Sequence, residues 1–280
     1  MSDVAIIGAD DLGGAIAHLL AGRNLVRAIR LADDRGRVAA GKALDIVQAG
    51  AIEAHATRID ASADPLEVTG ARIVVVAGGA GRGEWQGDEG LRLIRAVLQR
   101  TANPIVLCAG ASHRELVERG CRELRVPRAR LIGSAPHALT AAARALVALE
   151  TDSSPRDVGL TLLGVPPGGI VIPWTDATIG GFNAVRVVGE PQRRRIASRL
   201  PALWPPGAYA LAAAAVDAVA ALVGRSRATL SCFVGPDLAS GARTRAAALP
   251  VRLGLEGIER VAVPELSALE RVALENAMNL

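Results

Sequence analysis

Aromatic residues are scarce in this chain of 280 residues. Phenylalanine, tryptophan and tyrosine together make up only 2% of it, so a platform of stacked rings for nucleic-acid bases is not expected. Lysine is scarcer still, because Lys42 is the only one and arginine supplies nearly all of the positive charge. The arginines alternate with acidic residues, as in RELVERGCRELRVPRAR, which is typical of a solvated surface. The net charge of +4 therefore does not predict a nucleic-acid partner.

Cysteine is also rare, and its spacing excludes two classes of protein. Cys108, Cys121 and Cys232 are odd in number, widely separated and without a neighbouring histidine cluster. This pattern predicts neither a disulfide framework nor a metal site, and it favours a reducing, cytoplasmic compartment. No apolar run reaches transmembrane length, and the apolar start at Val4 lacks a basic leader and a secretory cleavage pattern. We therefore expect no membrane partner and no export.

The first half of the chain alternates short β-branched runs with longer amphipathic segments. This alternation predicts an α/β fold with a Rossmann-type, doubly wound parallel sheet. Such sheets bind ligands at the carboxyl ends of their strands, so we expect functional loops at that edge. The predicted strands are 4–9, 27–33, 72–79, 104–110 and 129–135.

After about residue 150 the pattern becomes that of a mixed α+β C-terminal domain. Short apolar runs are separated by proline and glycine turns, which favours antiparallel strands. The segment 151–157 supplies a junction, with a helix start at Ser153 or Ser154. We expect a dinucleotide-binding domain over 1–150 and a second domain over 151–280. In the latter the predicted strands lie in 159–174, 184–189, 228–236 and 257–266, and the helices over 191–203 and 208–224.

The stretch AIIGADDLGGAIAHLL, Ala5 to Leu20, resembles the phosphate-binding turn of dinucleotide-binding folds. Gly8 and Gly13 occupy the first and third glycine positions of that turn, but Asp10 occupies the second. Asp33, twenty residues after Gly13, stands where an acidic residue binds the ribose hydroxyls. A strand, turn and helix whose glycines serve only packing is the plainer alternative. The candidate cofactor-binding residues are thus Gly8, Asp10, Gly13 and Asp33.

Asp10 bears directly on whether a phosphate binds at this turn. A carboxylate about 5 Å from a phosphate charge costs on the order of 3 kcal/mol at an effective dielectric constant near 20, which is about a hundredfold in affinity. An aspartate near a helix start also caps free backbone amides. We therefore expect weak, rearranged or absent dinucleotide binding. If no phosphate occupies the site, the Asp10 carboxylate can take its place at the helix start.

The order of segments resembles the lactate/malate dehydrogenase family, and most closely its malate dehydrogenases. The residues that carry the resemblance run in family order over nearly the whole chain: AIIGADDLGGAIAHLL, IRLADDRGRVAAGKALDI, ARIVVVAGGAGRG, ELRVPRARLIGSA, DATIGGF, GAYALAAAAVDAVAALVGRSRATLSCFVGPD, LPVRLGLEGIERV and ELSALERVALENA. The resemblance implies a Rossmann domain followed by a substrate domain, NAD as cofactor, hydride transfer to or from a 2-hydroxy acid, and a homodimer or tetramer.

The family chemistry, as the resemblance implies it, needs a histidine that exchanges a proton and an aspartate that orients this histidine. The family's Gly-x-His-Gly-Asp stretch corresponds to Gly164–Gly169, where Pro166 stands for the histidine. Leu139 stands at the place of the orienting aspartate. Proline and leucine cannot move a proton, and loss of either group lowers rates by several powers of ten when they act together.

The family also needs arginines that bind the substrate carboxylates. By the same correspondence, the arginine positions fall on Gly81, Gly87 and Ala142, and the substrate-contacting Thr-Asn-Pro on 108–110, which is Cys-Ala-Gly here. The side chains able to take over these roles are His113, His137, Arg82 and Arg144, with His18 and His55 as poorer candidates. We therefore assign no catalytic residue.

Three functions remain open from the sequence. The first is a catalytically degenerate relative, a pseudo-dehydrogenase that uses the scaffold for binding, regulation or assembly, with a possible small-molecule ligand. The second is an active NAD-dependent oxidoreductase acting on malate or another 2-hydroxy acid. The third is new chemistry in the same cleft, although no paired carboxylates, activated nucleophile or metal cluster supports it.

Overall fold

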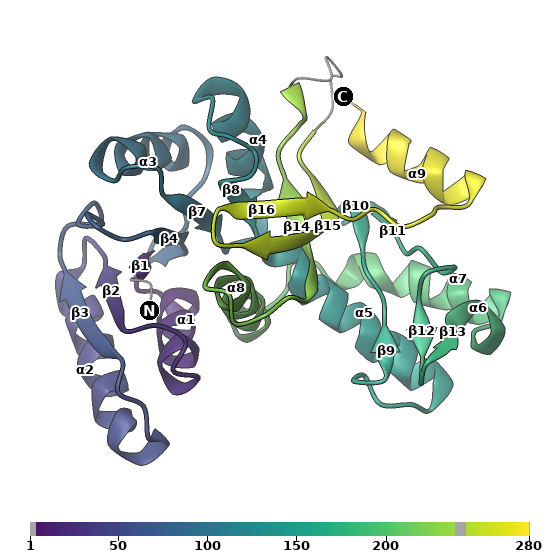
Figure 1. Cartoon of the computed structure of the whole chain (residues 1–280), viewed down its shortest axis with the longest axis horizontal. Helices are drawn as coiled ribbons and strands as arrows, with labels where there is room; N and C mark the ends of the chain where they lie inside the picture. Colours follow the sequence, from purple (N-terminus) through teal and green to yellow (C-terminus); the bar gives the residue numbers. More distant parts are fainter. Residues whose placement is uncertain (1–3, 239–244, 280) are drawn as a thin grey trace.

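The computed structural model describes residues 4–238 and 245–279 (Figure 1). In the first half, the strands are β1 (Val4–Ile7), β2 (Ala28–Ala32), β3 (Arg58–Ser62), β4 (Ile73–Val76), β5 (Gly78–Gly79), β6 (Gly83–Glu84), β7 (Ile105–Cys108) and β8 (Leu131–Gly133). The helices are α1 (Asp11–Gly22), α2 (Gly36–Glu53), α3 (Gly87–Arg100), the 3-10 helix η1 (Ala111–His113), α4 (Arg114–Glu123) and α5 (Ala135–Thr151).

The second half contains shorter strands and three longer helices. Its strands are β9 (Val158–Gly159), β10 (Leu163–Val165), β11 (Gly169–Val171), β12 (Thr178–Ile179), β13 (Phe182–Asn183), β14 (Thr229–Val234), β15 (Ala247–Gly254) and β16 (Gly257–Val261). Its helices are α6 (Ala184–Val187), α7 (Glu190–Arg199), the 3-10 helix η2 (Leu200–Leu203), α8 (Ala208–Leu222) and α9 (Ala268–Met278).

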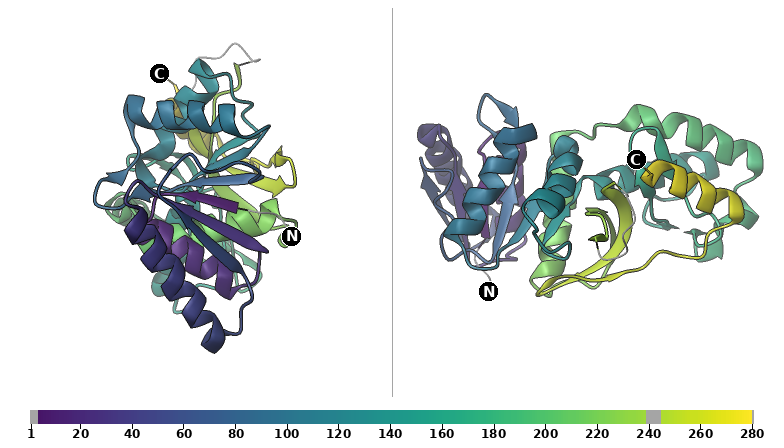
Figure 2. Two further views of the ribbon diagram at one scale, coloured as in Figure 1. Left: turned by 90° about the vertical axis from the view of Figure 1, so that its left-hand side faces the viewer. Right: turned by 90° about the horizontal axis from the view of Figure 1, so that it is seen from above.

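One large sheet runs through both halves in the order β11-β10-β15-β14-β8-β7-β4-β1-β2-β3, with β16 paired to β15. The strands from β8 to β3 are parallel, whereas β14, β15, β10 and β11 pair antiparallel. Figure 2 shows the twist of the parallel part and the helices that cover it. The predicted fold class, a Rossmann-type sheet followed by mixed α and β structure, is confirmed, while the domain boundary near residue 150 stays a prediction.

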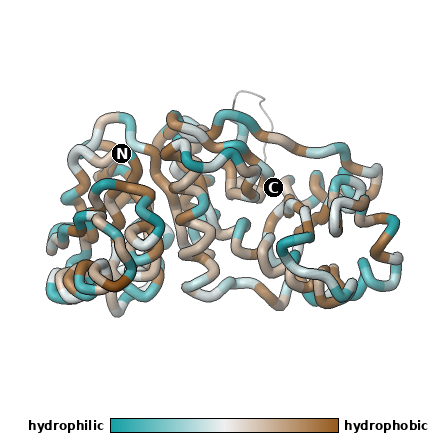
Figure 3. The backbone as a smooth tube through the Cα atoms, turned by 60° about the horizontal axis from the view of Figure 1, so that its bottom comes forward, coloured by the Kyte–Doolittle hydropathy of each residue, from teal (hydrophilic) through white to brown (hydrophobic). Residues whose placement is uncertain are grey.

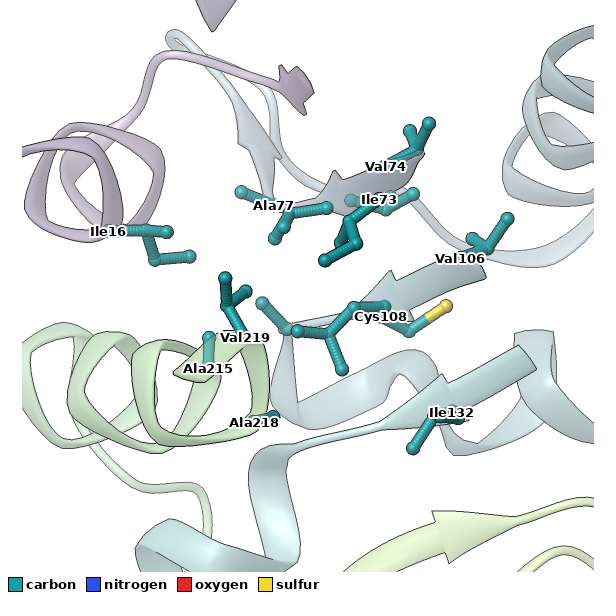
Figure 4. Packing of buried hydrophobic residues seen from close by; sticks show 14 of the residues in the cluster. Ile16, Ile73, Val74, Ala77, Val106, Cys108, Ile132, Ala215, Ala218 and Val219 are labelled. Carbon is teal, nitrogen blue, oxygen red and sulfur yellow. The ribbon is translucent and has the colours of Figure 1, made fainter. Parts of the chain in front are cut away.

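Small side chains allow close packing between helices and the parallel strands. Figure 4 shows Ala215, Ala218 and Val219 of α8 facing Ile16 of α1 and the ends of β4 and β7. All four of these side chains are at most 1% exposed. Because alanine adds almost no width to a helix, α8 lies close to α1 without aromatic residues to fill a gap, which explains how a chain poor in aromatics builds a dense core.

Two local predictions are wrong, and each has a local cause. The segment 184–189, predicted as a strand, begins with helix α6, because the Asn183 side chain accepts a hydrogen bond from the Val185 amide at 2.9 Å and caps a helical turn. No helix starts at Ser153 or Ser154. Instead α5 ends at Thr151, and Asp152 adopts a left-handed conformation with φ of 49°.

Several strands lie outside the predicted ranges, among them β3, β6, β12, β13 and the long β15. Strand β3 lies at the edge of the parallel sheet, where it pairs with β2, and only Ile59 and Ser62 of it are buried. The very short β5 and β6 form a hairpin over 78–84 through the pairs Gly78–Glu84 and Gly79–Gly83. This segment is called the 78–84 hairpin below, and its glycine-rich sequence carries no strand signal.

Hydropathy varies along the whole backbone, with hydrophobic and hydrophilic stretches in both halves (Figure 3). Among the described residues, no single helix combines the length and the apolar composition that crossing a membrane requires. The segments 190–203 and 208–222 reach that length and composition only when taken together, and they are bent by 99° relative to each other.

Candidate functional site

The turn after β1 is held by contacts that only glycine permits. Gly8 has a φ of 104°, and a Cβ atom on it would lie 2.2 Å from the carbonyl oxygen of Gly78. A Cβ atom on Gly13 would lie 2.0 Å from the carbonyl oxygen of Gly8. The two glycines therefore bring the β1 turn, the start of α1 and the 78–84 hairpin into direct backbone contact.

Asp10 is the N-cap of α1. One carboxylate oxygen accepts a hydrogen bond from the Gly13 amide at 2.9 Å, and the other lies so close to Gly78 that a Cβ atom there would be 2.0 Å from it. Burial raises the pKa of Asp10, although the Gly13 and Gly78 amides and Lys42 act in the opposite direction. The carboxylate thus caps the helix N-terminus, which is one of the two roles that the sequence leaves open for Asp10.

Lys42 of α2 fixes the same turn from the other side. Its ammonium group donates a hydrogen bond to the Asp10 carbonyl oxygen at 2.7 Å and lies 3.5 Å from the Asp11 carboxylate. Its side chain also passes over Gly14, where a Cβ atom would be 2.9 Å from the lysine Cδ. The only lysine of the chain therefore joins α2 to the start of α1.

Asp33, at the end of β2, is 1% exposed and binds three backbone amides. One carboxylate oxygen accepts hydrogen bonds from Ala9 at 2.7 Å and Ala80 at 2.9 Å, and the other accepts one from Arg35 at 2.8 Å. Burial alone would raise the pKa of Asp33, but these amides hold it below its ordinary value. Asp33 thus ties together the β1 turn, the segment after β2 and the 78–84 hairpin.

These positions do not fit NAD in the described conformation. A ribose hydroxyl would have to reach a carboxylate that is buried and already bound to the Ala9 and Ala80 amides. A pyrophosphate would need the space between α1 and Gly78 that the Asp10 side chain fills. The turn keeps the shape of a dinucleotide-binding fold, but its own carboxylates take up the groups that would hold the cofactor.

Glu84 repeats this arrangement at the next strand end, and the sequence reasoning missed it. Its carboxylate accepts hydrogen bonds from the Ala111 amide at 2.9 Å, the Ser112 amide at 2.8 Å and the Ser112 hydroxyl. Burial opposes ionisation, but the Ser112 hydroxyl, the neighbouring His113 and the two amides lower the pKa of Glu84. The 78–84 hairpin is therefore fastened to the N-terminus of η1, after β7. No local sequence signal marks this contact, because the two segments meet only in the folded chain.

The two loop positions assigned to substrate arginines by resemblance have backbones that disfavour any side chain. Gly81 and Gly87 have φ values of 75° and 53°, and a Cβ atom on Gly81 would lie 2.5 Å from an Arg35 guanidinium nitrogen. A left-handed backbone at a long side chain costs on the order of 1 kcal/mol or more. The neighbouring Arg82 is paired with Glu89 at 3.0 Å and lies 4.8 Å from the Trp85 ring centre.

The candidate histidines do not come together into one site. His113 is fully buried, its Nδ1 accepts a hydrogen bond from the Gly110 amide at 3.0 Å, and burial lowers its pKa to about 4. His137 of α5 lies 3.5 Å from Asp217 of α8, which also binds Arg23 at 2.8 Å. Because burial and these separate partners hold each ring in a different place, His113 and His137 do not form a relay.

The remaining candidates also lie apart. His18 pairs with Glu53 at 2.9 Å on the exposed faces of α1 and α2, His55 packs against Gly50, and Arg144 lies on α5. Leu139 is fully buried in an apolar cluster, and Pro166 lies in the turn between β10 and β11. Within residues 4–238 and 245–279, no three His, Cys, Asp or Glu side chains gather as metal ligands would.

A cavity of about 360 Å³ lies beside the glycine turn rather than in it. It opens between α1, α2 and the start of α8, and its walls include Gly14, His18, Lys42, Asp45 and Tyr209. None of Gly8, Gly13 and Asp33 lines it. The cavity is therefore separate from the place where the fold would hold a dinucleotide.

Comparison with known proteins gives a consistent set of relatives. No family model matches the chain. The malate dehydrogenase of Chlorobium phaeobacteroides is 24% identical over 99% of this chain and 98% of its own length. The L-lactate dehydrogenase of Kosmotoga olearia is 26% identical over 98% of this chain and 92% of its own length. The lactate dehydrogenase of Cryptosporidium parvum, solved with lactic acid and nicotinamide adenine dinucleotide, has the same fold, with a TM-score of 0.84. The two chains are 21% identical, and the match covers 99% of this chain and 94% of the other.

These full-length matches agree with the order of the motifs, the mixed sheet and the glycine turn after β1. Over nearly its whole length the chain is similar to members of the lactate/malate dehydrogenase family.

Proposed function

We propose that this chain is a non-catalytic member of the dehydrogenase family, in which the scaffold serves as a binding or regulatory module and hydride transfer is lost. The observation that carries the proposal is the use of three acidic side chains as internal ligands at the carboxyl edge of the sheet. Asp10 caps α1, Asp33 binds the Ala9 and Ala80 amides, and Glu84 binds the start of η1. Each carboxylate accepts hydrogen bonds from backbone amides that would otherwise be free to bind an anion or a ribose.

The backbone of the 78–84 hairpin supports the same proposal. Gly81 in this hairpin and Gly87 at the start of α3, the positions assigned to arginines by resemblance, have positive φ values that disfavour a long side chain. Pro166 stands at the position of the proton-exchanging histidine and has no titratable group. Restoring one side chain would therefore leave the carboxylate-binding geometry and the proton shuttle incomplete.

The test is titration of the full chain with NADH by calorimetry, followed by assays with oxaloacetate and pyruvate. We expect no saturation below millimolar NADH and no turnover. Asp10→Gly should bind NADH more tightly than the parent protein, since removal of the carboxylate relieves repulsion of about 3 kcal/mol, but it should still not oxidise NADH. Asp11→Gly is the matched control, because this neighbouring carboxylate is 97% exposed and should change NADH binding little.

The alternative is an active NAD-dependent oxidoreductase for malate or another 2-hydroxy acid, which the names of the relatives favour. Turnover above roughly 1 per second, within the ordinary range of enzymes, would establish this alternative and overturn the proposal. Tight NADH binding without turnover would instead indicate that the protein senses a dinucleotide without reducing or oxidising a substrate. In that case Asp33 must exchange its backbone partners for a ribose, and Asp33→Asn should weaken NADH binding.

We also propose that the chain forms a homodimer through α2 and the start of α8, in keeping with its family. Leu44, Val47 and Ile52 of α2 are 59%, 46% and 90% exposed, and Tyr209 of α8 is 84% exposed, beside the 360 Å³ cavity. Neighbouring exposed apolar side chains are typical of a protein interface. Sedimentation equilibrium should give twice the chain mass, and Leu44→Asp should give the monomer mass.

A further inference from the structure

A second cavity, of about 340 Å³, lies at the opposite edge of the sheet from the glycine turn. It opens between the end of α8, the loop 224–228 and the hairpin of β15 and β16. The tip of that hairpin contacts the residue before β4, because Arg72 donates a hydrogen bond to the Leu255 carbonyl oxygen. This is the amino edge of the parallel strands, whereas Gly8 and Asp33 follow strands at the carboxyl edge.

The walls of this cavity carry positive charge that the chain does not neutralise. Arg227 and Arg252 line it, Arg225 precedes the lining residue Ser226, and Arg260 lies opposite Arg252 in the β15–β16 register. All four residues are exposed. Within the part of the chain that the structure describes, their guanidinium groups form no hydrogen bond and no ion pair. This differs from Arg119, for example, which contacts three carboxylates.

The cross-strand placement of Arg252 and Arg260 costs stability. Like charges directly opposite each other on antiparallel strands repel, and Arg252 lies opposite Arg260. The only carboxylate lining the cavity is that of Glu259, whose side chain lies over Gly254, where a Cβ atom would be 1.8 Å from its Oε1. Glu259 forms no ion pair with the arginines among the described residues, so an anion in the cavity would meet the unpaired Arg227 and Arg252, with Arg225 and Arg260 close by in the chain and in the strand register.

We propose that this cavity binds a small, multiply charged anion of the phosphate-ester or pyrophosphate class. Guanidinium groups form paired hydrogen bonds to phosphate oxygens, and the two that line this cavity, Arg227 and Arg252, match two phosphate groups or one phosphate and one carboxylate. The volume lies in the range of small-ligand pockets. Leu253 and Leu255 give one wall an apolar surface for a short carbon chain. None of the described residues that line the cavity is aromatic, so these residues offer a base no ring to stack on.

The test is calorimetric titration of the full chain with inorganic pyrophosphate and, separately, orthophosphate at constant ionic strength. Pyrophosphate should bind more tightly than orthophosphate. Arg227→Gln and Arg252→Gln should each weaken pyrophosphate binding about tenfold or more, since each removes a charge-assisted hydrogen-bonding group. Glu259→Gln should strengthen it by about threefold, because it removes the one carboxylate beside the ligand.

Arg186→Gln is the matched control. It removes the same charge from an exposed arginine of α6, far from the cavity (Figure 1), and should change the affinity less than twofold. If Arg186→Gln weakens binding as much as Arg252→Gln, the anion is held only by net charge and the proposal fails. Equal affinity in the parent protein, Arg227→Gln and Arg252→Gln also overturns it. Melting temperatures establish that each variant is folded, and the result is independent of NADH binding at the other edge.

Discussion

Replacement of Asp33 by asparagine should destabilise the protein strongly in the absence of any nucleotide. The carboxylate accepts three backbone hydrogen bonds, at 2.7, 2.8 and 2.9 Å, in a position that is 1% exposed. Asparagine can keep its oxygen toward Ala9 and Ala80, but its NH2 group then faces the Arg35 amide, which is itself a donor. The lost charge-assisted bond and the weakening of the other two amount to about 3 kcal/mol.

That loss should be visible in thermal unfolding. At roughly 2 °C per kcal/mol for a chain of this size, Asp33→Asn should lower the melting temperature by about 6 °C at pH 7. Asp34→Asn is the control, because Asp34 is 47% exposed and only 3.6 Å from Arg82. An exposed pair of this kind contributes at most about 1 kcal/mol. If both variants lose the same small amount, the carboxylate of Asp33 does not hold the β1 turn and the hairpin together.

The difference between the parent protein and Asp33→Asn should depend on pH in one direction. The pKa of Asp33 is lower in the folded chain than its ordinary value near 3.8, so its stabilising effect is present above about pH 4. This effect is lost as the pH falls through the folded-state pKa. The gap in melting temperature should therefore narrow below pH 4, and a gap that widens with acid would contradict the role given to the carboxylate.

Two further variants test the 78–84 hairpin. Gly78→Ala should lower the free energy of unfolding by about 1 to 2 kcal/mol in the parent protein, because the new methyl group displaces the capping Asp10 carboxylate. In an Asp10→Gly background the same substitution should cost clearly less. Equal costs in both backgrounds, measured by urea unfolding, would mean that the two side chains do not compete for space. Glu84→Gln should speed hydrogen exchange of the Ala111 and Ser112 amides, because these amides donate hydrogen bonds to the Glu84 carboxylate at 2.9 and 2.8 Å. Unchanged exchange rates would show that Glu84 does not hold the hairpin to η1.

Much of the parallel sheet was predictable because its signals are local. Continuous β-branched runs such as the one ending at Val76 can hardly be anything but buried strands, and the five predicted strands of the first half correspond to β1, β2, β4, β7 and β8. The short elements were less predictable. Helix α6 depends on one capping side chain, Asn183, and β5 and β6 form from glycines that have no strand preference.

In the candidate site, too, the features set by neighbouring residues were predictable and the long-range contacts were not. The spacing of Gly8, Asp10, Gly13 and Asp33 is a property of the sequence, and it was enough to indicate a dinucleotide-type turn with an acidic residue inside it. It was also enough to offer helix capping as one role for Asp10, and the structure shows the partner, the Gly13 amide, only three residues away. Contacts of this range follow from local backbone geometry, which neighbouring residues largely set.

The sequence alone determined the family resemblance, the parallel sheet and the position of the glycine turn, because periodicity and motif order are properties of the linear chain. Only the tertiary structure decided what the acids and arginines do. Asp33 meets Ala80 across 47 residues, Glu84 meets Ser112 across 28, and Arg252 meets Arg260 through strand register. Because charges act through space and not along the chain, these pairings, and the function that follows from them, exist only once the chain has folded.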